Sequence, residues 1–136
     1  MIEEQYVSFE TAKLAKEKGF DEEFENMHVW NNFKGEILED VSGYNMKNSH
    51  LCKNSYSAPT QSLLARWLRE KHNFTVIIVP VIGYYRSVGI TKYSFRLFKK
   101  WNLISDSSKS EDTYEKAMEA GLQEALKLIE SEVTND

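Results

Sequence analysis

The segment 61–82, QSLLARWLREKHNFTVIIVPVI, indicates the fold more clearly than any other part of the chain. Its first half carries apolar residues at helical spacing, which form one apolar helix face: Leu63, Leu64, Trp67 and Leu68. Its second half, Phe74–Ile82, is a β-branched run typical of a well-buried strand. Asn73 separates the halves and is a residue type that ends helices well. The segment therefore predicts a helix that is followed directly by a strand.

The residues after this segment predict a second strand and a final helix. Residues 91–97 alternate between two faces, with Tyr93, Phe95 and Leu97 on one and Lys92 and Arg96 on the other. The alternation breaks at residues 98–101, where we expect the strand to end or to bulge. Pro80 has no N–H to donate, which places the first strand of this hairpin at an edge or a bulge. Residues 102–111 form a polar connector, and a helix is expected from about residue 112 to 130.

The residues before the segment predict another helix and another hairpin. The helix should cover residues 9–18, with Ser8 as the N-cap and Gly19 in the left-handed conformation at its end. Residues 27–31 and 36–41 are expected to be short strands around a turn at 32–35. Residues 42–57 show no periodicity and are expected to be a long loop. Residues 57–61 should form a helix entrance with Pro59 in the first turn.

The predicted fold class is α+β. The order of elements is helix, hairpin, helix, hairpin, helix, with an antiparallel sheet packed against the helices. A chain of 136 residues with 41% hydrophobic residues fits one domain, residues 1–136, around one core.

Charge is distributed very unevenly along the chain. Residues 51–102 contain nine Lys or Arg and one acidic residue, a balance of +8. Residues 1–50 (five Lys, eleven acids) and residues 103–136 (three Lys, nine acids) each have a balance of −6. The basic middle is also rich in aromatic residues, and cations among aromatic rings suit an anionic or planar ligand. The same asymmetry could also serve the packing of acidic flanks against a basic middle.

The basic middle supplies the candidate ligand-binding residues. Two Arg lie one turn apart on the predicted helix, and two cations lie on one face of the predicted strand, roughly 13 Å apart. With the residues of the intervening turn they would form an anion-binding patch for a phosphate or nucleotide. The candidates are Arg66, Arg69, Tyr84, Arg86, Lys92 and Arg96. The alternative is that they are ordinary solvated positions.

Several classes of function lack support in the sequence. No motif that would activate a nucleophile is present, so no catalytic residue is predicted and a non-catalytic role is favoured over an enzyme. The three His and single Cys show no metal-ligand spacing, so neither a metal nor a cofactor is predicted. The net charge of −4 and pI of about 5.5 disfavour duplex nucleic acid as a partner.

The sequence also predicts a cytoplasmic protein with no membrane partner. The longest apolar run, residues 76–82, is too short to span a bilayer, and the acidic N-terminus lacks the pattern of a signal peptide. A single cysteine, Cys52, cannot form an internal disulfide, which suits a reducing compartment.

Three blocks of the chain resemble small hypothetical proteins of phages and prophages from Bacteroides-type gut bacteria. The blocks are residues 56–72, residues 114–129, and the opening around residues 6–10 and 18–20. The resemblance implies a phage or prophage setting and no particular activity.

Together these observations predict a phage- or prophage-type accessory protein that acts as a non-catalytic binding module. Its partner would be a host protein or a small anionic or nucleotide ligand. The alternatives are an enzyme of unrecognised class acting on nucleotides and a weak nucleic-acid-binding protein. Homo-oligomerisation is a further alternative, through the Tyr93/Phe95/Leu97 face or the strand that bears Pro80.

Overall fold

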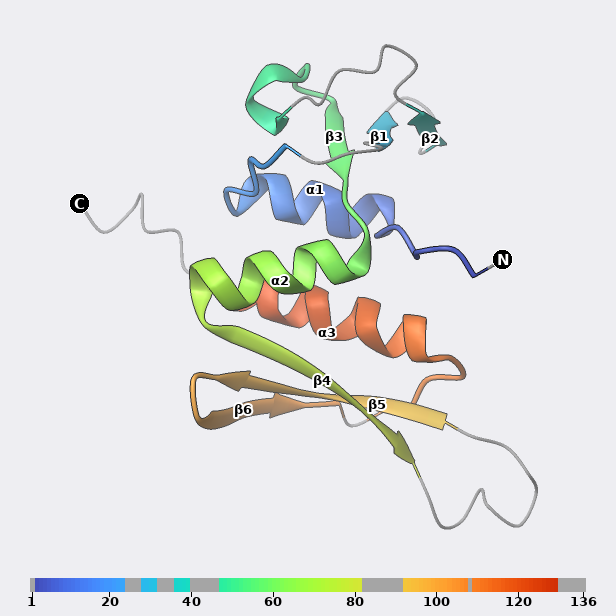
Figure 1. The fold of residues 1–136 in the computed structure, drawn as a ribbon, viewed down its shortest axis with the longest axis vertical. Helices are drawn as coiled ribbons and strands as arrows, with labels where there is room; N and C mark the ends of the chain where they lie inside the picture. The colour runs from blue at the N-terminus through green and yellow to red at the C-terminus, as the bar shows by residue number, and fades with distance from the viewer. Residues whose placement is uncertain are drawn as a thin grey trace. The chain divides into compact units, whose positions relative to one another are not determined.

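The computed structural model describes residues 2–23, 28–31, 36–39, 47–81, 92–107 and 109–129. The chain divides into two compact units, residues 1–64 with 130–136 and residues 65–129, and each is described by itself. In the described ranges the chain is α+β, with three α-helices and two antiparallel three-stranded sheets (Figure 1). The α+β class with antiparallel pairing agrees with the prediction. The simple alternation of helices and hairpins is not confirmed, because each hairpin gains a third strand.

The first unit begins with α1 (Phe9–Glu17), close to its predicted bounds. Ser8 Oγ accepts the Thr11 N–H, and Gly19 has a φ of 97°, as expected for the two ends of this helix. Thr11, Ala12 and Ala15 are fully buried. Their small side chains allow the helix to pack closely against β3 (Ser55–Ala58).

The sheet of the first unit has β1 (His28–Asn31) between β2 (Glu36–Glu39) and β3. The pairing of β1 with β2 confirms the predicted hairpin, while the predicted turn at residues 32–35 lies outside the described residues. The Trp30 indole N–H donates to the carbonyl of Val7 over 3.0 Å, which ties β1 to the chain just before α1.

The predicted loop at 42–57 was wrong in its described part, because it contains a 3₁₀ turn, η1 (Asn48–His50), and β3. The buried Asn48 side chain joins both neighbours: Nδ2 donates to the Phe20 carbonyl over 2.7 Å and Oδ1 accepts the Ser57 N–H over 2.8 Å. Phe20 and Ser57 are 28 and 9 residues away from Asn48, so no local sequence pattern indicates β3.

The second helix, α2 (Gln61–His72), begins later than the predicted entrance at 57–61 because residues 55–58 pair with β1. Thr60 Oγ1 accepts the Leu63 N–H over 3.2 Å, as an N-cap residue does. The predicted apolar face is confirmed, with Leu64, Trp67 and Leu68 buried. Asn73 has a φ of 62° and ends the helix, as predicted.

The second unit contains a sheet in the order β4–β5–β6, formed by β4 (Phe74–Val81), β5 (Lys92–Lys99) and β6 (Asn102–Asp106). Within this sheet β4 is an edge strand, which agrees with the expectation from Pro80. The predicted irregularity at residues 98–101 is a register shift in the β5–β6 pairing between Leu97 and Phe98, followed by a tight turn. The predicted polar connector at 102–111 was wrong in its first half, because that half is β6.

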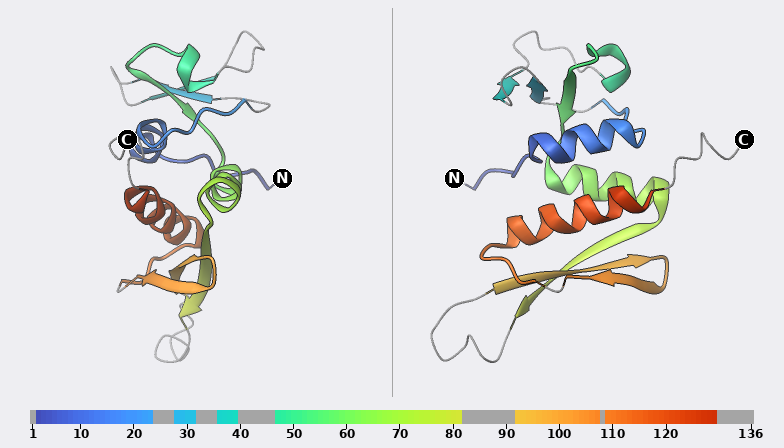
Figure 2. Two further views of the ribbon diagram at one scale, coloured as in Figure 1. Left: turned by 90° about the vertical axis from the view of Figure 1, so that its left-hand side faces the viewer. Right: turned by 180° about the vertical axis from the view of Figure 1, so that it is seen from behind.

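The last helix, α3 (Tyr114–Leu128), packs on one face of this sheet. Thr113 Oγ1 accepts the Lys116 N–H, which fixes the start of the helix two residues after the predicted one. Phe95 and Leu97 lie under the helix and are buried, so the predicted oligomer face Tyr93/Phe95/Leu97 is occupied by α3 of the same chain. Within the second unit, neither α3 nor the last two turns of α2 lie on the opposite face of the sheet (Figures 1 and 2). No helix in the described ranges is long and apolar enough to cross a bilayer.

Candidate binding site

The structure places four of the six predicted ligand-binding residues, and Tyr84 and Arg86 lie outside the described residues. Arg66 and Arg69 are exposed on α2, and Arg66 Nε lies 3.2 Å from Glu70 Oε1. Lys92 and Arg96 share one face of β5, as predicted. That face points away from α3, whereas α2 lies on the same side of the sheet as α3 (Figure 2). The helix pair and the strand pair therefore lie on different sides of the sheet.

Lys92 is engaged by an acidic residue of the region that follows the sheet. Its ammonium group forms an ion pair with Asp112 and lowers the pKa of that carboxyl group below its usual range, mainly through a hydrogen bond. Lys92 belongs to the basic middle and Asp112 to the acidic C-terminal flank, so this ion pair is an example of the neutralisation that the charge distribution allows.

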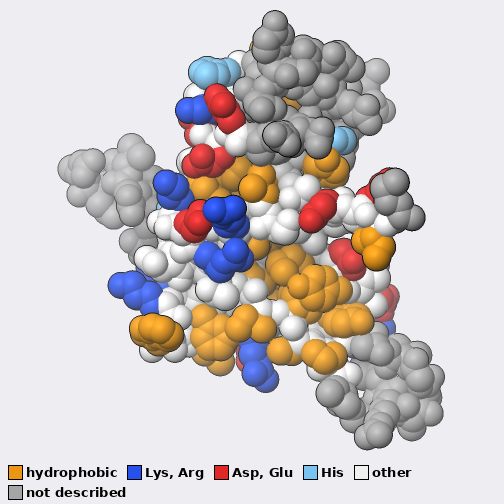
Figure 3. Space-filling model, viewed as in Figure 1, with side chains coloured by type: hydrophobic (Ala, Val, Ile, Leu, Met, Phe, Trp, Pro, Cys, Tyr) orange, Lys and Arg blue, Asp and Glu red, His pale blue; other side chains and the backbone are white. Residues whose placement is uncertain are grey.

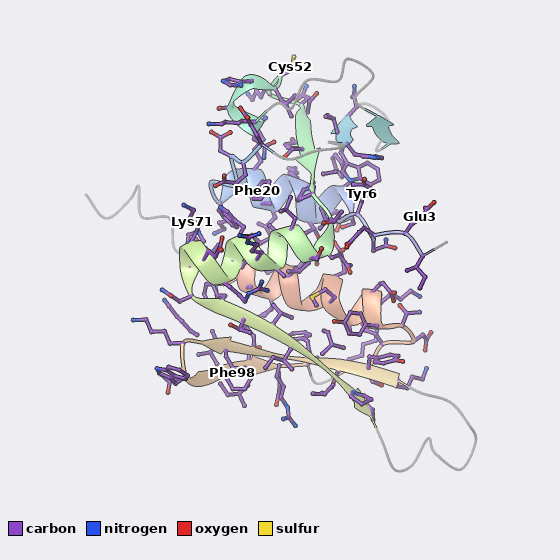
Figure 4. The ribbon with its side chains drawn as sticks, in the orientation of Figure 1. Glu3, Tyr6, Phe20, Cys52, Lys71 and Phe98 are labelled. Atoms are coloured by element: carbon purple, nitrogen blue, oxygen red, sulfur yellow. The ribbon has the colours of Figure 1, made fainter. Side chains whose placement is uncertain are left out.

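A different set of residues, three Lys and one Trp, lies at the C-terminus of α2 and in the β5–β6 turn. We call this set the basic tip, and it consists of Lys71, Lys99, Lys100 and Trp101. The Lys100 N–H donates to the Asn73 carbonyl over 3.0 Å, which joins the turn to the residue that ends α2. Figure 1 shows both segments at the same end of the unit, and Figure 4 labels Lys71 there.

The turn of the basic tip is short and its backbone is unusual. Lys99 pairs with Asn102, so only Lys100 and Trp101 connect β5 to β6. Lys100 has a φ of 56° and Asn73 one of 62°, both in the left-handed region that non-glycine residues seldom adopt. A non-glycine residue keeps a left-handed conformation when surrounding contacts stabilise it. Here the hydrogen bond between the Lys100 N–H and the Asn73 carbonyl is such a contact.

The side chains of the basic tip are presented to solvent. Trp101 is 94% exposed, which is exceptional for the largest apolar side chain. Lys99 Nζ lies 5.4 Å from the centroid of the buried Phe74 ring, an attractive cation–π geometry that orients the Lys99 side chain. Lys71 and Lys100 are exposed. In the space-filling view, hydrophobic side chains gather over the sheet with Lys and Arg side chains beside them (Figure 3).

All charged residues of the basic tip are cations. Residues 71–74 and 98–103 contain three Lys and no acidic residue. Lys71 also stands in the last turn of α2, where the partial negative charge of the helix end favours a cation. An exposed indole among three ammonium groups can bind a surface that is both apolar and acidic.

Sequence reasoning placed these residues in the basic, aromatic middle but did not select them as a site. The available signal was the sequence Lys99-Lys100-Trp101 at the point where strand alternation stops. Its proximity to Lys71 depends on the hydrogen bond between Lys100 and Asn73, which no sequence pattern indicates.

The described residues contain no grouping of three or more His, Cys, Asp or Glu side chains that could hold a metal ion.

The side chain of Cys52 is exposed, and its backbone carbonyl accepts a hydrogen bond from Lys16 Nζ over 3.1 Å. Lys16 also donates to the Ser55 carbonyl, and its burial lowers the pKa of its ammonium group. These contacts brace α1 against the start of β3.

Comparison with known proteins adds no family to these observations. No family model, no curated protein and no solved structure matches the chain.

Proposed function

We propose that this chain is a non-catalytic binding module whose basic tip recognises an acidic, partly apolar surface on a partner protein. The observation that carries the proposal is the 94% exposure of Trp101 on a turn flanked by Lys99 and Lys100. Trp is enriched among the residues that dominate the energetics of protein interfaces, and an exposed indole has much apolar surface to bury. The ammonium groups beside it favour a partner surface that is acidic. If the resemblance to phage and prophage proteins extends to biology, the partner is a host protein.

The shape of the basic tip favours a macromolecule over a small ligand. Sites for small molecules are concave and enclose most of the ligand, whereas Trp101 projects from a two-residue turn. Charge favours an acidic protein over nucleic acid, because the chain has a net charge of −4 and a balance of −6 in each flank. A small anionic or nucleotide ligand remains the alternative, and it would bind at the Arg66 and Arg69 pair or at Arg96, because the two sets lie on different sides of the sheet.

The test compares the wild-type chain with the variant K99E/K100E in affinity capture from the cells that naturally produce the protein. A matched control, K13E/K53E, changes the net charge by the same amount at exposed positions of the first unit. Proteins retained by the wild type and by the control, but lost with K99E/K100E, are purified and titrated by calorimetry against these three chains and against the variant W101A. We expect W101A and K99E/K100E each to weaken binding at least tenfold, with affinity that falls as salt rises.

The opposite results are equally clear. If K99E/K100E and W101A bind every captured protein as tightly as the wild type does, the basic tip is not the recognition surface. If the captured molecule is nucleic acid, the assignment to a protein partner is wrong.

A further inference from the structure

The strand β4 lies at the edge of its sheet, so one row of its backbone groups is directed away from the other strands. The Phe95 carbonyl accepts the Ser107 N–H over 3.0 Å on the far side of β5, away from β4. Phe95 stands opposite Ile78, and in such an antiparallel pair both residues direct their backbone groups away from each other. Ile78 therefore directs its N–H and carbonyl to the open edge. By the alternation along a strand, so do three further residues of β4: Phe74, Val76 and Pro80.

The open edge of β4 lacks most of the features that protect an edge strand from pairing. Such strands usually carry charged side chains or β-bulges. The sequence of β4, FTVIIVPV, contains no charged residue, and the strand pairs with β5 through all eight residues without a register shift. Pro80 is the exception, because it lacks an N–H and ends the row of donors. From Phe74 to Ile78 the edge thus offers a regular, uncharged row of backbone donors and acceptors, which is a template for an added strand.

The side chains of β4 also have apolar surface left to bury. Ile77 is 42% exposed. Val76 and Ile78 are on the face that α3 contacts, yet both are only partly buried. Figure 2 shows β4 at one side of the sheet. A strand added beside β4 would cover part of each of these side chains in addition to pairing the backbone groups.

Cations lie at the N-terminal end of the open edge. Lys99 stands opposite Phe74, the first residue of β4, with its Nζ 5.4 Å from the centroid of the Phe74 ring. Lys71 stands in the last turn of α2, just before Phe74 in the chain. Within the described ranges neither Lys71 nor Lys99 forms an ion pair. A strand with acidic residues at the end beside Phe74 would bring carboxylates to both ammonium groups.

We infer that the partner contributes an extended apolar segment with an acidic end, and that this segment adds to β4 as a fourth strand. The inference rests on the proposed function, because Lys71 and Lys99 belong to the basic tip. The backbone of the segment bonds along the edge to Val76 and Ile78, and its acidic end lies beside the two lysines. A second copy of β4 does not match these cations, because β4 has no acidic residue.

Amide hydrogen exchange, measured by NMR on the isotope-labelled full chain, tests the inference. In the free chain, the Val76 and Ile78 amides should exchange faster than those of Ile77 and Val79, which are directed to β5. The probes are two synthetic peptides, Thr-Val-Thr-Val-Thr-Glu-Glu and its reverse, because an added strand can run in either direction. At about 2 mM of one of them, we expect exchange at Val76 and Ile78 to slow at least threefold, as for a Kd of about 1 mM or lower. Exchange at Ile77 and Val79 should not change.

Two comparisons test the role of charge. The same peptides with Lys in place of Glu should leave the Val76 and Ile78 amides unchanged. The variant K71E/K99E should reverse the preference, so that it responds to the Lys peptides and not to the Glu peptides. The matched variant K13E/K53E, altered at exposed positions of the first unit, should behave as the wild type does. The Lys peptides act on the wild-type chain, so the test of charge does not depend on the folding of a variant.

Three results contradict the inference. Slow exchange at Val76 and Ile78 in the free chain means that the edge is already covered, and by a second copy if the rates depend on protein concentration. No response to either Glu peptide overturns it, as does an equal response to the Lys peptides. Each of these results leaves the proposed function in place if capture of the partner still depends on Lys99, Lys100 and Trp101. Capture that does not depend on those residues contradicts the proposed function, whatever the peptides do.

Discussion

At the scale of single residues, a glycine allows α3 to lie close to the sheet of the second unit. Gly121 is buried in the middle of α3, and a Cβ placed there would lie 2.5 Å from Val76 Cγ1 and 3.2 Å from Phe95 Cβ. Real Cβ atoms do not approach other atoms so closely. The missing side chain therefore determines how near α3 can lie to β4 and β5.

We expect Gly121→Ala to destabilise the protein, although Ala is the better helix former by about 1 kcal/mol. Overpacking costs roughly 1–3 kcal/mol and should outweigh that gain. Urea unfolding measures the change in the free energy of unfolding. The same substitution in a Val76→Ala background, where Cγ1 is gone, should cost less. If Gly121→Ala alone raises the free energy of unfolding, α3 can move away from the sheet without cost and this account is wrong.

Asp21 is the residue for which a pH dependence is expected. Its Oδ1 accepts the Ser49 N–H over 2.7 Å, and this hydrogen bond is the main reason that the pKa of its carboxyl group is lowered. A carboxyl group with a lowered pKa in the folded state stabilises the fold above its ordinary pKa, and the stabilisation disappears as the pH falls through the folded value.

Asp21→Asn keeps an acceptor oxygen but removes the charge. At pH 7 we expect it to lower the free energy of unfolding by less than about 1 kcal/mol, because the carboxyl group is near the surface. The difference from the wild type should shrink as the pH falls below about 4. Chemical unfolding at several pH values measures it, and a difference that grows towards acid would contradict this account.

At the scale of elements, helix ends were more predictable than strands. Ser8, Gly19 and Asn73 act as expected because a cap depends on one residue type and a few neighbouring backbone groups. The strands β3 and β6 were not predicted, because each has only four or five residues, several of them polar, and shows no clear alternation. Each strand is determined by its pairing with a neighbouring strand, β1 for β3 and β5 for β6. For β6 the turn also carries no Asn or Gly, and Lys100 takes the left-handed position in their place.

The cap of α3 gives a prediction at this scale. Thr113→Ala removes the oxygen that accepts the Lys116 N–H, and we expect it to cost about 1 kcal/mol in the free energy of unfolding. Thr113→Ser keeps the oxygen and should remain within a few tenths of a kcal/mol of the wild type. Equal losses for both variants, measured by urea unfolding, would mean that the methyl group and not the cap is responsible.

At the scale of the whole molecule, the two compact units share one helix. Gln61–Leu64 of α2 belong to the first unit, and Ala65–His72 belong to the second. An α-helix propagates its hydrogen bonds from turn to turn, so melting of one end weakens the other. The prediction of a single domain, residues 1–136, comes from the length and composition of the chain.

We therefore expect one cooperative thermal transition in calorimetry, with equal calorimetric and van't Hoff enthalpies. The enthalpy should be about 95 kcal/mol near 60 °C for a chain of this length. Gly121→Ala, which lies in the second unit, should shift the whole transition to lower temperature. Two transitions, of which only one responds to Gly121→Ala, would show that the units unfold independently.

The sequence by itself determined the helices and the first hairpin of each sheet, together with the α+β class. These features depend on periodicity, caps and breakers within a few residues of one another. It also showed that the cations and aromatic residues are concentrated in residues 51–102.

Only the tertiary structure decided which of these residues share a surface. It covers the Phe95 and Leu97 face with α3, leaves Ile77 and Leu103 exposed on the other face, and joins Lys100 to Asn73 at the basic tip. The physical reason is that strand order and helix packing bring together residues that are distant along the chain. A local pattern records which face of an element is apolar, but it does not record what covers that face.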